Sequence, residues 1–235
     1  PVWDWGNKRI GVLQVQVFRG NGTYLGNVCK GLWPELASHD RILKHQQPGA
    51  VFVDPGTVSE DGDRSLELKH SHFEALWMSM EVVRILTHRK GAWEELFSSS
   101  CAAVLRPEQR VSLPGEAERT GYQGGDATPE VCALVDWKDR IYTRQSMQDG
   151  LYQALGAMFP DLPPLVLIAL AELMTYVSVA CVRGKFWRGQ TKWYGSDNSN
   201  TVGWIRGRYS TNQIAQFLLR VLGIAEATWG FDSYA

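Results

Sequence analysis

Apolar and polar residues alternate in a way that divides the first half of the chain into short strands followed by helices. Val12 to Phe18 is strand-like and precedes a Gly-Asn-Gly turn, so we expect a β-hairpin over residues 9–33. A further short strand is expected at residues 50–54, where an apolar run ends in Asp-Pro-Gly. Apolar residues at close to helical spacing then predict two amphipathic helices, over residues 65–87 and 92–105.

The second half follows a stretch rich in proline and glycine at residues 106–125, which we expect to separate two domains, 1–115 and 116–235. Strands and helices then alternate. The expected elements are strands at 131–137 and 140–144, a helix at 165–182, a strand at 191–195, helices at 200–206 and 210–227, and a strand from 229. For the helix at 210–227 we expect Ser210 and Gln213 to form a capping box. The pattern predicts an α/β chain with a smaller α+β segment in its first half.

The composition is that of a folded protein without a strong net charge of either sign. Of the 235 residues 44% are hydrophobic, which is enough for a substantial core, and the formal net charge is −1. Four scattered cysteines without a CxxC pair favour free thiols in a reducing compartment. The N-terminus lacks a signal-peptide pattern, although it also lacks an initiating Met, as a fragment would. We expect an intracellular location, cytoplasmic or nuclear.

The apolar run from Leu165 to Val182 is slightly short for a membrane span and carries Glu172 near its middle. We therefore expect a buried helix and no membrane partner. A carboxylate in such surroundings is costly unless it is protonated, binds a metal, or pairs with a cation such as Arg183 or Arg206.

Two more acids lie in contexts that suit metal binding. Asp197 follows the strand expected at 191–195, and Asp126 lies in Gly-Gly-Asp-Ala-Thr-Pro. Each also has an ordinary interpretation, because Asp126 is a good turn residue and Asp197 suits an Asx-turn or a helix cap. Asp136, at the end of another expected strand, is a reserve ligand, although a hairpin-tip aspartate followed by Lys-Asp is more often exposed.

Taken in order, these segments resemble a known family. Gly125-Asp126-Ala-Thr, the strand Val131 to Trp137, Ala171-Glu172-Leu on a helix, and Gly195-Ser-Asp-Asn198 before Val202-Gly-Trp-Ile resemble the ribonuclease H-like domain. The nearest type is the domain attached to reverse transcriptases of retroelements, particularly the tyrosine-recombinase (DIRS-type) elements. The resemblance covers about the second half of the chain. It implies a mixed sheet flanked by helices, within a longer polyprotein.

The resemblance also implies a chemistry, which is Mg²⁺- or Mn²⁺-dependent hydrolysis of the RNA strand of an RNA/DNA hybrid. It implies Asp126, Glu172 and Asp197 as the catalytic metal ligands, with Ser196 and Asn198 contacting those ligands or the substrate backbone. Cations and aromatic residues interleave in the segments 183–193 and 204–209. The residues expected to bind the hybrid are Arg183, Lys185, Trp187, Arg188, Lys192, Asn198, Arg206 and Arg208, with Trp187 and Trp193 able to stack on bases.

The chain departs from the family pattern in two places. The family carries a further Asp after its last strand, whereas this chain ends at Ala235, and Asp232 lies inside the expected strand and is a poor substitute. We therefore expect a domain that is incomplete at its C-terminus. In addition, residues 1–115 contain no paired-aspartate polymerase motif, and their role stays unassigned.

Two other functions remain as alternatives. One is a non-catalytic nucleic-acid-binding or structural remnant of a retroelement, in which the three acids need not converge. The other is a methyltransferase-like enzyme centred on Asp54, which would need a cofactor pocket in the first half of the chain. The sequence shows no convincing glycine-rich cofactor loop before Asp54.

Overall fold

The computed structural model describes residues 8–28, 30–44, 52–54, 65–88, 120–147, 153, 157 and 162–235. The chain forms two compact units. We call residues 1–28 and 35–92 the N-terminal unit, and residues 29–34 and 93–235 the C-terminal unit. The helix expected at 92–105, and the part of the expected linker before residue 120, lie outside the described residues.

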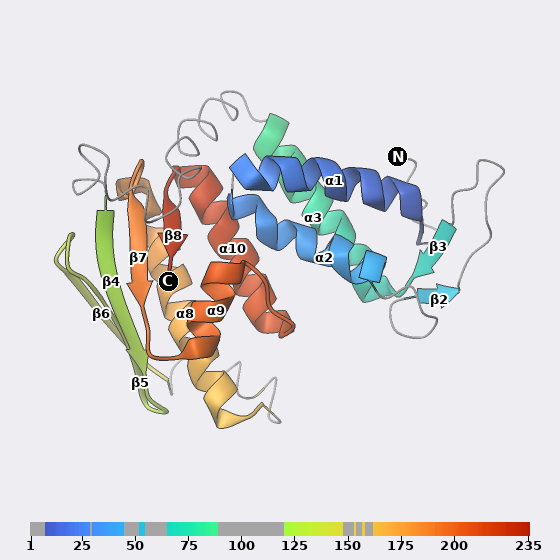
Figure 1. The fold of residues 1–235 in the computed structure, drawn as a ribbon. Coiled ribbons are helices and arrows are strands. Elements are labelled where there is room, and N and C mark those ends of the chain that lie inside the picture. Colours follow the sequence, from blue (N-terminus) through green and yellow to red (C-terminus); the bar gives the residue numbers. More distant parts are fainter. Residues whose placement is uncertain are drawn as a thin grey trace. The chain divides into compact units, whose positions relative to one another are not determined.

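The N-terminal unit combines a small antiparallel sheet, of strand order β1-β3-β2, with helices (Figure 1). Its elements are β1 (Arg9–Gly11), α1 (Val12–Val28), α2 (Trp33–Lys44, whose first two residues belong to the other unit), β2 (Phe52–Asp54), β3 (Ser65–Leu68) and α3 (His70–His88). A cluster of buried apolar residues forms its core: Ile10, Val12, Val15, Ile42, Leu68, Phe73 and Leu76.

The β-hairpin expected at residues 9–33 is wrong, because most of this segment is the helix α1. Val12, Val15 and Gly22 are buried along α1 at intervals of three and seven residues, which is a helical repeat. Gly22 packs so closely on the Leu36 side chain of α2 that a Cβ atom there would clash. Helix packing therefore outweighs the strand propensity of the valines.

The single helix expected at 65–87 is instead two elements. Residues Ser65–Leu68 pair with β1 as strand β3, and α3 begins only at His70. The helical spacing of apolar residues is correct for α3, but a four-residue strand is too short for periodicity to separate it from the helix that follows. The short strand expected at 50–54 is present as β2.

The C-terminal unit is built on a five-stranded mixed sheet of order β6-β5-β4-β7-β8 (Figure 1). β5 is antiparallel to both β4 and β6, whereas β7 is parallel to both β4 and β8. The elements are β4 (Thr120–Ala127), β5 (Val131–Asp136), β6 (Ile141–Ser146), α8 (Pro164–Arg183), β7 (Thr191–Gly195), α9 (Ser199–Gly207), α10 (Gln213–Trp229) and β8 (Asp232–Tyr234).

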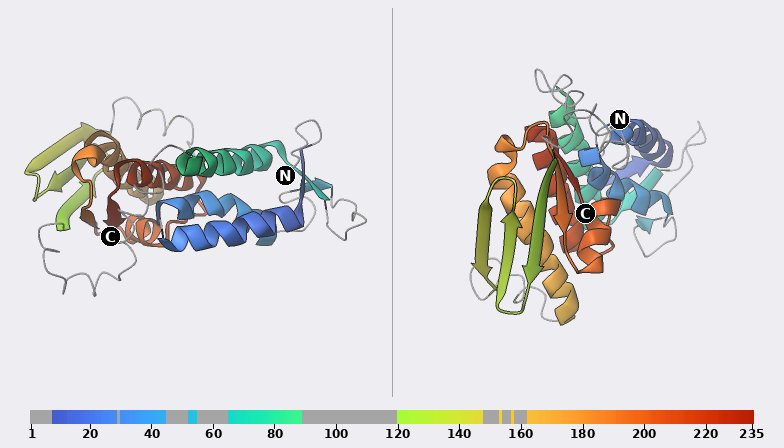
Figure 2. Two further views of the ribbon diagram at one scale, coloured as in Figure 1. Left: turned by 90° about the horizontal axis from the view of Figure 1, so that it is seen from above. Right: turned by 60° about the vertical axis from the view of Figure 1, so that its left-hand side comes forward.

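Helix α8 covers one face of this sheet, and α10 packs on α8 (Figure 2, right, where the strands lie in front of α8). Alternate residues of β5, namely Cys132 and Leu134, point into the core between sheet and helices. The C-terminal unit is thus an α/β unit with a mixed sheet and flanking helices, as the sequence predicts.

The helix α8 lies in the core of this unit. The stretch Pro164–Phe186 is long enough to cross a membrane, and an 18-residue window within it has a mean hydropathy of 2.2, but 61% of that window is buried inside the protein. The core helix of a folded domain has the same length and composition, so hydropathy alone does not identify a membrane span here.

The linker expected at 106–125 is wrong over its last residues, which belong to β4. Three glycines of β4 face bulky side chains, and a Cβ atom would crowd Lys192 at Gly121, Trp137 at Gly124 and Tyr194 at Gly125. These glycines therefore permit close packing across the sheet rather than a break in the strand.

Helix α10 begins three residues later than expected. The side chain of Asn212 caps it and accepts hydrogen bonds from the backbone N–H groups of Ile214 and Ala215, both at 3.0 Å. Ser210 instead accepts from the backbone N–H of Asn212 at 3.0 Å, so the expected capping box is absent. The other helices and strands predicted from residue 131 onward are present, with ends within a few residues of their expected positions.

Candidate metal centre

Three carboxylates converge in the C-terminal unit, at the ends of the inner strands β4 and β7. One oxygen each from Asp126, Glu172 and Asp197 lie within 4.8 Å of one another. Asp126 and Asp197 are exposed, whereas Glu172 is buried on α8. The structure therefore brings together the three acids that the sequence singles out.

The strand pairing explains why the two aspartates meet. β4 and β7 are parallel neighbours, and their last paired residues are Gly124 and Gly195. Asp126, near the end of β4, and Asp197, just after β7, each lie two residues beyond this last pair, at the same end of the two strands. Side chains that follow the carboxyl ends of adjacent parallel strands lie close together.

Glu172 enters the group from α8, and its surroundings favour the neutral acid. Burial raises the pKa of Glu172, the hydrogen bond from the Ser196 hydroxyl opposes that shift, and the charges of Asp197 and Asp126 raise the pKa further. A bound cation would reverse this balance, because it would stabilise the charged form.

Local hydrogen bonds fix the conformation of the segment between β7 and α9. Ser196 donates from its hydroxyl to Glu172 and accepts from the backbone N–H of Asn198 at 2.9 Å. Asn198 caps α9 by accepting from the backbone N–H of Asn200 at 3.1 Å. The backbone of Asp197 is therefore held between Ser196, which binds Glu172, and Asn198, which caps α9, whereas its exposed side chain is not held by these bonds.

These distances suit a hard divalent cation. Oxygens bound to Mg²⁺ at about 2.1 Å lie about 3 Å apart when adjacent and about 4.2 Å apart when opposite. The observed limit of 4.8 Å lies slightly above that range, so a small movement of the exposed aspartates would let all three oxygens contact one ion. Carboxylates are the ligand type that Mg²⁺ and Mn²⁺ prefer.

The reserve acid, Asp136, belongs to a different cluster. It is fully buried rather than exposed at a hairpin tip, and it pairs with the buried Lys192 ammonium at 2.9 Å. It also accepts from the Gln123 amide at 2.6 Å. Burial raises the pKa of Asp136, but hydrogen bonds from the backbone of Asp139 and from these two side chains bring the pKa below its usual value.

Asp232, the poor substitute for a fourth ligand, lies away from the three acids. It pairs in register with Thr191, the first residue of β7, whereas Asp197 follows the last residue of that strand.

The residues expected to bind nucleic acid fall into two groups, one buried and one accessible to solvent. Trp187, Lys192 and Arg208 are buried, and Lys192 and Arg208 form ion pairs with Asp136 and Glu226. They hold the fold and leave no surface for a phosphate. The remaining five are exposed or half-buried: Arg183, Lys185, Arg188, Asn198 and Arg206.

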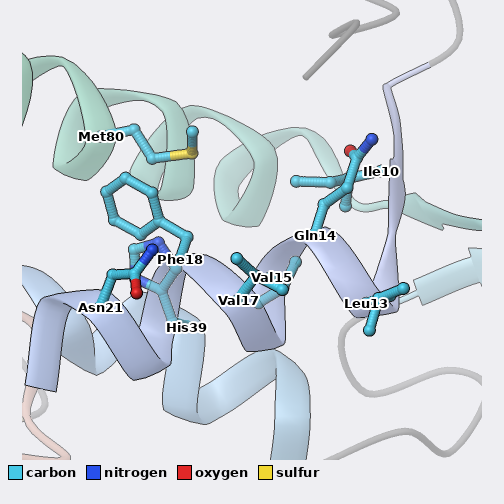
Figure 3. Close-up of a pocket in the computed structure, with 9 residues that line it drawn as sticks. All are labelled: Ile10, Leu13, Gln14, Val15, Val17, Phe18, Asn21, His39 and Met80. Carbon is cyan, nitrogen blue, oxygen red and sulfur yellow. The ribbon is translucent and has the colours of Figure 1, made fainter.

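The N-terminal unit contains an open cavity of about 370 Å³, lined mainly by apolar side chains of α1 (Figure 3). His39 of α2 and Met80 of α3 also line it. The side chain of Asp54, on which the methyltransferase-like alternative depends, lies outside the described residues.

One feature that sequence reasoning missed is a set of exposed aromatic residues on the sheet. Tyr122, Trp137 and Tyr142 each keep about 60% of their surface in solvent, with values of 60%, 61% and 63%. The alternation Tyr122-x-Gly124-x-Asp126 is a strand pattern, and it is hidden by the neighbouring glycines, which favour a loop.

Comparisons with known proteins add no family. No family model matches the chain, and searches of curated proteins and of solved structures find no match.

Proposed function

We propose that the C-terminal unit is a ribonuclease H-like nuclease domain that hydrolyses the RNA strand of an RNA/DNA hybrid, as part of a retroelement reverse transcriptase. The observation that carries the proposal is the convergence of Asp126, Glu172 and Asp197 within 4.8 Å. The mixed sheet with flanking helices supports it, because the family resemblance implies that architecture.

In this proposal the three carboxylates bind Mg²⁺ or Mn²⁺. Ions held there would supply Lewis-acid chemistry, lowering the pKa of the attacking water and neutralising charge on the leaving oxygen of the phosphodiester. Water forms the new P–O bond, the bond to the leaving oxygen breaks, and that oxygen takes up a proton. The task of the protein is to hold the ligands, and Ser196 does so by donating to Glu172.

The exposed cations of the same unit supply contacts to the substrate backbone. Lys185, Arg188 and Arg206 are exposed, as phosphate contacts must be. Such contacts confer affinity without sequence preference, which suits an enzyme that acts on hybrids of any sequence.

Cleavage of an end-labelled RNA/DNA hybrid in Mg²⁺ or Mn²⁺ tests the proposal. Asp126→Asn, Glu172→Gln and Asp197→Asn should each abolish cleavage, and Ser196→Ala should lower the rate about 10- to 100-fold, as is usual for a residue that positions a ligand. Glu74→Gln is the matched control, because Glu74 is exposed on α3 and pairs with His70.

The result also separates the alternative function. Metal binding at the three acids without cleavage of any hybrid would favour the non-catalytic remnant. Cleavage that survives all three substitutions would contradict the proposed site.

A further inference from the structure

The open face of the sheet in the C-terminal unit carries a row of aromatic side chains. Tyr122 of β4 pairs in register with Trp193 of β7, which pairs in turn with Tyr234 of β8. On the other side, the backbone N–H of Trp137 donates to the carbonyl of Tyr122 at 3.1 Å. The row therefore crosses four strands, a span of about 14 Å at a strand spacing of about 4.8 Å.

This row lies on the face opposite α8. Side chains alternate between the two faces of a strand, and Gln123 and Tyr194, next in sequence to two members of the row, are buried on the helix side. Figure 2 (right) views the sheet from the open face, and no described helix of the C-terminal unit covers it there.

Three further features make the aromatic surface continuous. The ring of Trp137 lies over Gly124, where a Cβ atom would come within 2.5 Å of it. In the next row, Tyr142 of β6 pairs with Val135, which pairs with Gly124. Trp193 and Tyr234 stack, with ring centroids 5.4 Å apart and an interplanar angle of 29°.

The chemistry of this surface fits nucleic-acid bases better than a protein helix. Its large side chains are all Tyr or Trp, which offer planar faces and polar tips, whereas a surface for helix packing is rich in Leu, Ile and Met. Cations border it, since Arg144 lies on the same face of β6 as Tyr142, and Lys138 and Arg140 are exposed in the β5–β6 turn.

The neighbouring acid of that turn does not offset these cations at the surface. Asp139 accepts from the indole N–H of the buried Trp187 at 2.8 Å and lies 3.4 Å from the buried Lys192 ammonium. Its charge is directed into the protein, so the border of the aromatic surface suits phosphates.

We propose that this open face binds single-stranded nucleic acid, with bases stacked on Tyr122, Trp137, Tyr142, Trp193 and Tyr234, and phosphates contacted by Arg140 and Arg144. Asp126 lies on the same face of β4 as Tyr122, but the bases stack on the aromatic rings, and binding there needs no metal ion. It goes beyond the proposed hybrid nuclease and does not depend on it.

Fluorescence anisotropy with labelled oligothymidylate and oligouridylate, measured in EDTA, tests this proposal. Tyr122→Ala and Tyr142→Ala should each weaken binding about 5- to 150-fold, the range for loss of one stacked base. Phe186→Ala and Phe217→Ala are matched controls, because they remove exposed aromatic rings on helical segments of the same unit, 53% and 58% exposed, and should leave affinity unchanged.

A second pair of variants distinguishes stacking from general apolar contact. Tyr142→Phe should retain binding and Tyr142→Leu should lose it, because only the first keeps a planar ring. Arg144→Gln should remove one phosphate contact and so reduce the slope of log affinity against log salt concentration by about 1. Thermal melting of each variant checks its fold, and these exposed positions should tolerate the changes.

The proposal fails if neither oligonucleotide binds at low salt, or if the alanine variants at Tyr122 and Tyr142 bind as well as the controls. Equal binding by Tyr142→Leu and Tyr142→Phe would also overturn it, and would favour a protein partner on this face. None of these outcomes depends on hybrid cleavage, so failure here is distinguishable from failure of the nuclease proposal.

Discussion

Two carboxylate clusters lie at opposite ends of strand β7, and they are built in opposite ways. Near its start, Asp136 is buried against the Lys192 ammonium and the Gln123 amide. Just past its end, Glu172 meets two further carboxylates, and the Ser196 hydroxyl donates to it. The first cluster is compensated within the fold, whereas the second gathers like charges.

The difference is seen in the pKa of the buried acid of each cluster. Opposite charges in a buried pair keep each other ionised, and the pKa of Asp136 is lowered even though burial opposes this. Like charges in one place disfavour ionisation, and burial and the two aspartates raise the pKa of Glu172. A fold tolerates the second arrangement at a cost, which a bound cation would remove.

The largest expected effect comes from breaking the compensated cluster. Lys192→Met should lower the free energy of unfolding by about 3–5 kcal/mol, because Asp136 would remain buried without its cation. Urea denaturation measures the loss. The exposed Lys185→Met is the control and should change stability by less than about 0.5 kcal/mol. A loss below about 1 kcal/mol at Lys192 would contradict the structural role of the pair.

The next largest effect is stabilisation of the protein by a metal ion bound to Asp126, Glu172 and Asp197. Mn²⁺ at about 100 times its dissociation constant should stabilise the wild-type protein by about 2.7 kcal/mol. Thermal unfolding with and without Mn²⁺ measures this gain, which Asp126→Asn should lose. If the variant gains as much stability as the wild type, the ion binds elsewhere.

A smaller effect is expected from Glu172→Gln in the absence of metal. Because the folded-state pKa of Glu172 is raised, its contribution to stability is present at low pH and is lost as pH rises through the folded pKa. The variant should therefore be more stable than wild type near neutral pH. Denaturation at several pH values checks this, and equal pH profiles for the two proteins would exclude a raised pKa.

Asp136 should show the opposite pH dependence. Its folded-state pKa is lowered, so its contribution is present above the unfolded pKa and is lost as pH falls through the folded pKa.

The smallest effect distinguishes two neighbouring tyrosines of the core, whose ring centroids are 4.6 Å apart and whose rings are tilted by 35°. The Tyr176 hydroxyl donates to Ser233 at 2.6 Å, whereas the buried Tyr194 hydroxyl has no hydrogen-bond partner among the described residues. Tyr176→Phe should cost about 1 kcal/mol, and Tyr194→Phe should be neutral or slightly stabilising. Equal losses on thermal unfolding would show that Tyr194 also has a partner.

The sequence predicts the C-terminal unit better than the N-terminal one, for physical reasons. The helix α8 and strands β5 to β7 have long or clearly bounded apolar patterns, and each acid of the trio stands within or beside such a pattern. In α1, valine-rich segments around Gly-Asn-Gly have the local propensities of a hairpin, and only packing against α2 decides for a helix.

Tertiary contacts also explain the other errors. The glycines of β4 indicate a loop until the side chains that pack on them are known. The hairpin-tip position of Asp136 gives no sign of its partner, because Lys192 lies 56 residues away in the sequence. Cations near an aromatic residue look like a nucleic-acid surface whether they are exposed, as Lys185 is, or buried, as Lys192 is.

The most direct test of the central claim is titration calorimetry of Mn²⁺ binding to the metal-free protein and to Asp126→Asn, Glu172→Gln and Asp197→Asn, with Glu74→Gln as control. If the three acids form one metal site, the wild type and the control bind Mn²⁺ alike and each of the three variants loses affinity. Absence of binding to the wild type, or binding that all three substitutions leave unchanged, would contradict it.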